Sequence, residues 1–267
     1  MAARDPERGG SSGPGRVQWT CGFGACRAAR AVRVLAESIR WFGGAGQNER
    51  PWEIPLELFL ERVDGLAQDC DRVLVLGTSF GAEAALSVGA LFSKVDAVVG
   101  FAPTDVVWAG VRPDGSVTSH WTLDGSPLPF VPFDDHWEAD SEIPAYVGLY
   151  EASRGRFSDR LVEAAIPVEK IGRLVLVGGA DDKVWPALEM ARVIEARRRA
   201  HGLDTVVVSD PGAGHSAILP GEPVVSRVVK LQHGGDEESD RRLGAAAWVE
   251  IRRLLGDNDL RGRFRRA

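Results

Sequence analysis

The stretch LVLGTSFGAEAAL (residues 74–86) places Ser79 between two glycines at the end of an aliphatic run. A serine at such a strand-to-helix turn can act as a nucleophile, because small flanking residues tolerate the strained backbone that presents its hydroxyl. The G-x-S-x-G pattern alone is weak evidence, since a chain with 31 Gly shows it by chance with a probability of about 0.2. The alternative interpretation is a serine that caps the following helix.

A serine hydroxyl is inert at neutral pH unless a base accepts its proton. His215 is the candidate base, because it alone among five histidines lies in a glycine-flanked loop after an aliphatic run, in DPGAGHSA (210–217). His120 and His136 fall in an irregular region, where substrate contact and solvent exposure are both open interpretations. A nucleophile at Ser79 therefore has one good candidate for its base.

The base in turn needs a carboxylate that fixes its tautomer. GGADDKVWP (178–186) offers Asp181 and Asp182 directly after another aliphatic run. We prefer Asp182, because Pro186 begins the next helix and leaves a short turn for Asp182, and Asp181 stays as the alternative. Serine, acid and base then follow one another in the order used by hydrolases that are built on an α/β sheet.

Alternating strands and helices must position these residues. Aliphatic runs bounded by Gly, Asp or Pro indicate strands buried on both faces of a parallel sheet; they are DRVLVLG (71–77), VDAVVGFAP (95–103), GRLVLVGG (172–179) and DTVVVSD (204–210). Helices are predicted over residues 54–70, 80–92, 186–202 and 238–255. This alternation predicts an α/β fold with a mostly parallel sheet flanked by helices.

Two regions do not follow the alternation. Residues 106–168 are rich in Pro, Gly and aromatic side chains, and we expect them to form an irregular lid over a pocket. Residues 1–16 are polar and rich in Gly and Pro, so we expect a polar leader there and a single catalytic domain over 17–267. Because no apolar strand is recognisable before ESIRWFG (37–43), the N-terminal part of the sheet is expected to be incomplete.

The negative charge that develops in acyl transfer needs two hydrogen-bond donors, the oxyanion hole. The backbone N–H of Phe80 is the expected first donor, because it follows the nucleophile. Gly10 in GGSSG (9–13) is the candidate for the second, with a leader outside the site as the alternative. Aromatic residues of the lid are expected to line an acyl-binding pocket, with packing against the sheet as the alternative; they are Trp108, Trp121, Phe130 and Phe133.

Composition argues against several other classes of function. The chain carries a net charge of -6, which does not favour a nucleic-acid partner. Its apolar runs have strand length and its start lacks the apolar core of a signal peptide, so no membrane partner is predicted and cytoplasmic residence is the default. Cys21, Cys26 and Cys70 form no paired motif and have no nearby His at ligand spacing. They are interpreted as buried or incidental thiols, and neither a disulfide framework nor a metal site nor another cofactor is predicted.

Several segments taken together resemble a known family. They are GTSFGAEAALSVGA, IPVEKI, GGADDKVWP, RRRAHG, DPGAGH and HGGDEESDRRLGAAAWVEI, in that order. The series resembles the catalytic C-terminal domain of the acyl-CoA thioesterases and bile acid-CoA:amino acid N-acyltransferases. The resemblance covers residues 36–256 and is more specific than the serine motif alone.

The resemblance implies an α/β-hydrolase fold similar to that of dienelactone hydrolase. It places the nucleophile on Ser79, the acid on Asp182 and the base on His215. Serine at the nucleophile position implies hydrolysis, since the members that conjugate amino acids tend to carry cysteine. We therefore expect a serine hydrolase of small-molecule acyl thioesters. The alternatives are a carboxylesterase or dienelactone-type hydrolase, an acyl-CoA N-acyltransferase, and an impaired relative that binds or scaffolds; the oligomeric state is left open.

Overall fold

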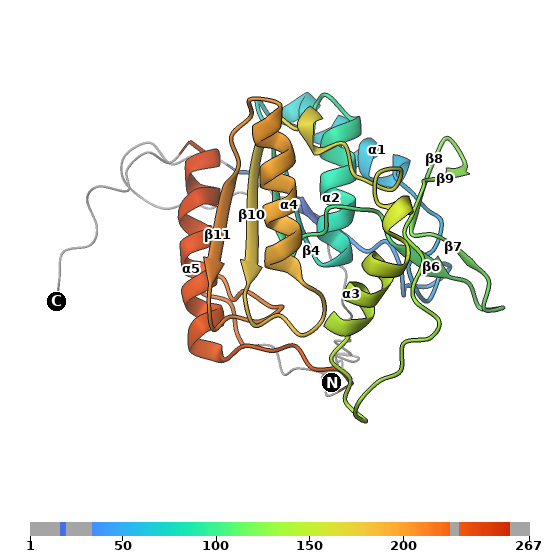
Figure 1. The fold of residues 1–267 in the computed structure, drawn as a ribbon. Helices are drawn as coiled ribbons and strands as arrows, with labels where there is room; N and C mark the ends of the chain where they lie inside the picture. Colours follow the sequence, from blue (N-terminus) through green and yellow to red (C-terminus); the bar gives the residue numbers. More distant parts are fainter. Residues whose placement is uncertain (1–16, 20–33, 225–229, 257–267) are drawn as a thin grey trace, which may run out of the picture.

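The computed structural model describes residues 17–19, 34–224 and 230–256, and Figure 1 shows its central sheet flanked by helices. The main sheet has the strand order β11-β10-β5-β4-β1-β2. Its parallel strands are β4 (Leu74–Thr78), β5 (Ala97–Phe101), β10 (Arg173–Gly179) and β11 (Val206–Asp210). β1 (Val17–Trp19) pairs antiparallel with β4 and with β2 (Glu37–Ile39). The predicted α/β fold with a mainly parallel sheet is thereby confirmed.

Helices cover both faces of this sheet. They are α1 (Glu57–Asp69), α2 (Phe80–Leu91), α3 (Val147–Arg156), α4 (Ala187–Ala200) and α5 (Glu237–Leu254). Along β4, Val75 packs into a hydrophobic cluster with α1, α2 and α4, whereas Leu74 and Leu76 pack into a cluster with α5. Burial on both faces explains the continuous aliphatic runs of the sequence. None of the described helices is long and apolar enough to cross a bilayer.

The N-terminal part departs from the sequence interpretation in two places. β1, which the sequence pattern did not predict, precedes β2 and joins it to the rest of the sheet. Cys70, at which α1 ends, is disulfide-bonded, so its interpretation as an incidental thiol is wrong. The predicted leader, residues 1–16, lies outside the described residues.

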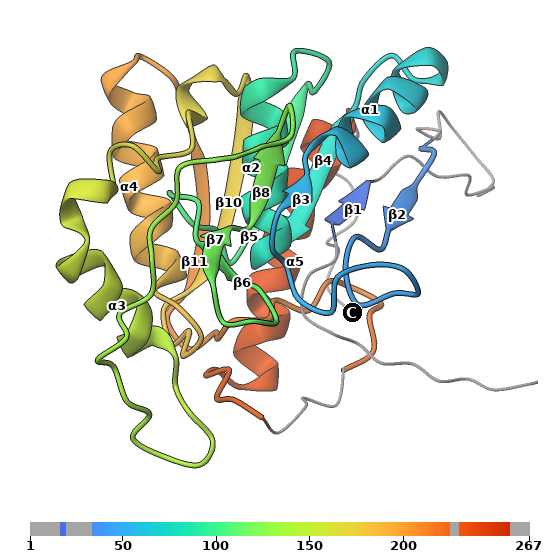
Figure 2. The ribbon, with the colours of Figure 1, turned by 90° about the vertical axis from the view of Figure 1, so that its right-hand side faces the viewer.

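The region over residues 106–168 stays out of the main sheet, as its composition indicated. β6 (Ala109–Val111) pairs with β7 (Val117–Ser119), while β8 (Trp121–Leu123) pairs with both β3 (Ile54–Pro55) and β9 (Ser126–Pro127). Helix α3 and the short 3-10 helices Ser158–Arg160 and Val168–Lys170 complete it. Figure 2 shows the β6–β7 hairpin and α3 on the side that faces the viewer. The role of residues 106–168 as a lid stays a prediction.

Candidate active site

Ser79 occupies a sharp turn between β4 and α2. Its backbone has φ 59° and ψ -125°, a conformation that costs a non-glycine residue free energy and that occurs mostly at functional sites. A Cβ added at Gly77 would lie 1.9 Å from the carbonyl oxygen of Gly81, so only glycine lets the strand and the helix approach this closely. Within the described chain, the Ser79 side chain makes no capping hydrogen bond to α2. The strained backbone of Ser79, and its hydroxyl that makes no capping hydrogen bond, favour a nucleophile over a residue that caps the helix.

His215 and Asp182 form a buried hydrogen-bonded pair. His215 Nδ1 lies 2.8 Å from Asp182 Oδ2, and both side chains are almost completely buried. Asp182 Oδ1 accepts hydrogen bonds from the backbone N–H groups of Val184 at 2.8 Å and Trp185 at 3.3 Å. Because an ionised carboxylate can only accept hydrogen bonds, Nδ1 of the histidine carries the hydrogen. Nε2 of His215 therefore keeps a free lone pair, which a general base needs.

The carboxylate of the neighbouring Asp181 binds other groups than His215. Its carboxylate accepts a hydrogen bond from the backbone N–H of Gly235 at 2.8 Å and pairs with Lys183 Nζ at 2.7 Å. The hydrogen bond from Lys183, with that from Gly235, holds the pKa of Asp181 below its usual value. Of the two candidate acids, the structure thus brings Asp182 to the histidine and uses Asp181 to fix a loop.

Glycines allow the loops around His215 to touch backbone to backbone. A Cβ at Gly214 would lie 2.4 Å from the carbonyl carbon of Gly234. A Cβ at Gly234 would lie 1.7 Å from the backbone carbonyl oxygen of Asp181. The backbone N–H of His215 donates to the carbonyl of His233 at 2.9 Å. The base is therefore held by contacts between three segments that are distant in sequence.

One indole connects the serine turn with the acid and base. The Trp185 ring is fully buried, and its centroid lies 5.6 Å from that of Phe80 and 5.7 Å from that of His215. Over the described residues, no hydrogen bond joins Ser79 to His215. Catalytic hydrogen bonds are often long without substrate and tighten in the complex. The structure thus brings the residues predicted as acid and base into contact and places Phe80, the residue after the serine, on the same indole.

The two predicted oxyanion donors differ in what the structure describes. Phe80 is the first residue of α2, where backbone N–H groups have no acceptor within the helix and the helix dipole favours negative charge. Among the described residues its N–H has no acceptor, so it can serve a ligand at the turn that carries Ser79. Gly10, the other candidate, lies outside the described residues.

The four aromatic residues assigned to an acyl pocket are largely committed to protein contacts. Trp108 and Trp121 are fully buried, and their indole N–H groups donate to Thr104 Oγ1 and Glu83 Oε1, each at 2.8 Å. Phe133 stacks on Trp108 with ring centroids 5.8 Å apart, and Phe130 packs against the main hydrophobic cluster. Their assignment to an acyl pocket stays a prediction.

A buried carboxylate behind the serine turn was not predicted. Glu83 is completely buried and accepts hydrogen bonds from the backbone N–H of Trp108 at 3.0 Å, from the Trp121 indole, and from His120 Nδ1 at 3.2 Å. His120 is therefore buried, whereas the side chain of His136 is exposed. An acidic residue within the otherwise apolar segment FGAEAAL was the available signal, because a charge flanked by buried positions needs partners.

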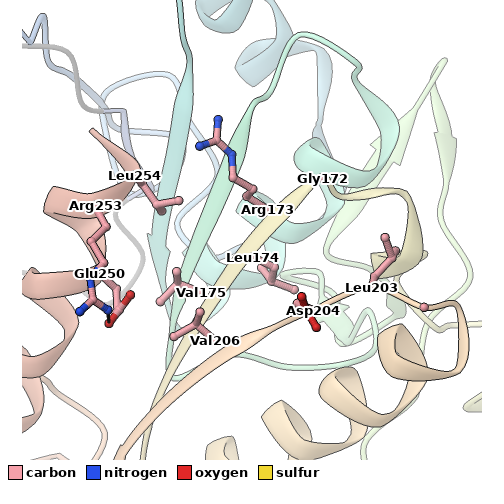
Figure 3. Close-up of a pocket in the computed structure, with 11 residues that line it drawn as sticks. Gly172, Arg173, Leu174, Val175, Leu203, Asp204, Val206, Glu250, Arg253 and Leu254 are labelled. Atoms are coloured by element: carbon pink, nitrogen blue, oxygen red, sulfur yellow. Dashed lines mark hydrogen bonds and ion pairs between the residues drawn. The ribbon is translucent and has the colours of Figure 1, made fainter. Parts of the chain in front are cut away.

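A cavity lies at the other end of the sheet. It has a volume of about 410 Å³ and is lined by the starts of β10 and β11 and by the end of α5 (Figure 3). Leu174, Val206 and Leu254 are among the lining side chains. Ser79, Asp182 and His215 all follow the carboxyl ends of strands, so this cavity is separate from the candidate active site.

Comparison with protein families identifies the family of this chain. A family model described as BAAT / Acyl-CoA thioester hydrolase C terminal matches residues 55–257, which is more than half of the chain and includes Ser79, Asp182 and His215. The described fold is compatible with the α/β-hydrolase fold of that family, and the family description indicates an activity like that of an acyl-CoA thioester hydrolase. No curated protein matches this chain.

Proposed function

Because the chain belongs to the BAAT / acyl-CoA thioester hydrolase C-terminal family, we propose that it is a serine hydrolase of acyl thioesters that uses Ser79, Asp182 and His215. The observation that carries this proposal is the 2.8 Å hydrogen bond between His215 Nδ1 and Asp182 Oδ2, beside a strained serine turn. This arrangement supplies an oriented base, its carboxylate and a free hydroxyl. The substrate in this proposal is a small molecule.

The reaction proceeds through an acyl-enzyme. Ser79 Oγ attacks the thioester carbonyl carbon while His215 Nε2 accepts the hydroxyl proton, and the Asp182 carboxylate stabilises the imidazolium. The carbon–sulfur bond then breaks, and the leaving thiolate takes the proton from His215. Water, deprotonated by the same histidine, attacks the acyl-serine and releases the acid. The Phe80 N–H stabilises the negative oxygen in both halves.

Serine supports hydrolysis rather than transfer to an amine. A serine acyl-enzyme is an oxygen ester, which an activated water cleaves readily, whereas a cysteine thioester survives longer for attack by an amine. The same triad also cleaves oxygen esters. Rates on acyl-CoAs and on aryl esters of matching chain length therefore distinguish the proposed thioesterase from a carboxylesterase.

The proposal is tested by following thiol release from acyl-CoAs of increasing chain length. Replacing Ser79 by alanine removes the nucleophile, and we expect kcat to fall by about 10⁴-fold to 10⁶-fold. Ser126→Ala is the matched control, because Ser126 is exposed on β9 and its loss leaves kcat unchanged. A fluorophosphonate probe should add its mass to Ser79 in the wild-type protein only. Full thiol release by Ser79→Ala would overturn the mechanism.

A further inference from the structure

Helix α3 of the 106–168 region is anchored on the turn that carries the acid. The N–H of Val147, the first residue of α3, donates to the carbonyl oxygen of Lys183 at 3.0 Å. Residues three apart share one face of a helix, so Tyr150 lies on the Val147 face one turn further on. The anchoring of α3 thus brings Tyr150 toward the loop of Asp182.

Tyr150 packs on the same indole that connects the serine turn with the base. Its ring is edge-on to Trp185, with centroids 5.2 Å apart and planes at 87°. Trp185 in turn packs against Phe80 and His215. Tyr150 is therefore a direct neighbour of the residue around which the candidate active site is arranged.

The hydroxyl of Tyr150 is a polar group without a partner. Its side chain is only 5% exposed and is surrounded by aromatic rings, including Trp108 at 4.7 Å and Phe133 at 5.5 Å. Among the residues that the structure describes, this hydroxyl makes no hydrogen bond, although such a loss costs about 1–3 kcal/mol for a buried group.

This hydroxyl stays protonated over the working pH range of a hydrolase. Burial raises the pKa of Tyr150, and the negative charges of Glu83 and Asp182 raise it further. The effect of Asp182 also places Tyr150 within the electrostatic field of the triad acid. A neutral O–H near that acid is a hydrogen-bond donor that holds its proton.

We propose that the Tyr150 hydroxyl donates a hydrogen bond to the carbonyl oxygen of the acyl group during attack by Ser79. It would be the second donor of the oxyanion hole, beside the Phe80 N–H. As Ser79 Oγ bonds to the carbonyl carbon, the π electron pair moves to the oxygen, which both donors stabilise. The pair returns when the carbon–sulfur bond breaks, and Tyr150 transfers no proton. This inference rests on the proposed function.

Tyr150→Phe tests the proposal, because it removes only the oxygen. We expect kcat to fall by about 10²-fold, the usual loss for one oxyanion donor, with KM changed by less than about threefold. The melting temperature should stay the same or rise, since the hydroxyl makes no hydrogen bond in the described protein. Tyr146→Phe, at the only other tyrosine of the chain, is the matched control and should leave kcat unchanged. Wild-type kcat in Tyr150→Phe would overturn the proposal.

A transition-state analogue separates an effect on the oxyanion from a change in folding. An acyl trifluoromethyl ketone adds to Ser79 and forms a negative oxygen, so its affinity should fall in Tyr150→Phe by the same factor as kcat/KM. Unchanged ketone affinity would overturn the role of Tyr150 even if kcat fell. If the wild-type protein hydrolysed no acyl-CoA, the proposed function would fail, and the ketone affinities would still test Tyr150 separately.

Discussion

The two ends of the main sheet differ in how their polar groups are used. At the carboxyl end, the described contacts leave the Ser79 hydroxyl and the Tyr150 hydroxyl without protein partners, beside the His215–Asp182 pair. At the amino end, the buried Arg198 uses all five of its N–H donors. They bond to Thr205 Oγ1 and to the carbonyls of Val168, Ile171, Gly172 and Asp204 at 2.5–3.2 Å.

The residues proposed for catalysis and the described cavity therefore lie at opposite ends of the main sheet. The amino end holds the cavity of about 410 Å³, and Gly172 and Asp204, which bond to Arg198, line it. The carboxyl end holds the strained Ser79 turn and the His215–Asp182 pair, which do not line this cavity. Polar groups that have no protein partner among the described residues, rather than this cavity, therefore mark the candidate active site. The amino end should respond to mutation in stability and the carboxyl end in rate.

The largest expected effect concerns the two adjacent aspartates. Asp182→Asn leaves the shape of the acid but puts His215 in the wrong tautomer, so we expect kcat to fall by about 10⁴-fold. Asp181→Asn is the matched control, because the amide oxygen can still accept from the Gly235 N–H and the lost pair with Lys183 is half-exposed. Thiol release by both variants is the measurement. Equal losses in the two variants would contradict the assignment of the acid.

The next effect concerns stability at the amino end. Arg198→Met deletes five hydrogen bonds and leaves buried carbonyls unpaired, so we expect the free energy of unfolding to fall by about 3 kcal/mol and the melting temperature by roughly 10 °C. The kcat of the folded variant should stay unchanged, because Arg198 lies away from the carboxyl end. Arg192→Met, at an exposed position of α4, is the control and should cost less than about 0.5 kcal/mol. A fall in kcat without loss of stability would break the comparison.

The sequence predicted the elements that show a regular pattern of apolar residues. The four parallel strands coincide with the predicted aliphatic runs, except that β4 extends one residue further to Thr78. A strand that is covered on both faces is mostly apolar, so such runs stand out in the sequence. β1 has three residues, too few for a period to show, and it is defined by pairing with β4. The strands of the 106–168 region likewise have two or three residues, so its irregular composition was visible in the sequence but its strand pairing was not.

The sequence does not predict the role of residues whose hydrogen-bond partners are distant along the chain. The sequence preferred Asp182 to Asp181 from a short local turn, and Asp182 is the one of the two that contacts His215, while its role as the acid stays a prediction. Glu83 and Arg198 instead obtain their partners from other elements: Trp108 and Trp121 are 25 and 38 residues from Glu83 in sequence. A charged residue in a helix predicts a solvated face unless such partners are known. Tyr150 was missed for the same reason.

A smaller effect is expected at the connection between the 106–168 region and α2. Glu83→Gln keeps the volume of the side chain but replaces one acceptor oxygen by an NH₂ group, which then faces either His120 Nδ1 or the N–H groups of Trp108 and Trp121. We therefore expect a loss of about 2 kcal/mol in the free energy of unfolding. Hydrogen exchange at the Trp108 amide should accelerate, because its acceptor is weakened. Glu151→Gln, at an exposed position of α3, is the control. Unchanged exchange at Trp108 would show that the carboxylate does not hold this region.

The smallest effect is expected from filling the cavity at the amino end. Val206 begins β11 and lines that cavity, and Val206→Phe places a larger apolar side chain there. Asp210, at the carboxyl end of the same strand, is four residues away, or about 13 Å at the rise of a β-strand. We therefore expect kcat/KM for acyl-CoAs to stay within about twofold and stability within about 0.5 kcal/mol.

The control for this variant is Val117→Phe, because Val117 is exposed on β7 and does not line the cavity. Both variants should match the wild-type protein in kcat/KM across all acyl chain lengths. A tenfold loss in Val206→Phe alone, growing with acyl chain length, would mean that the cavity holds the acyl group. The acyl group would then have to extend from Ser79 to the amino end of the sheet. The cavity would then belong to the substrate site, and the separation of the cavity from the proposed catalytic residues would be wrong.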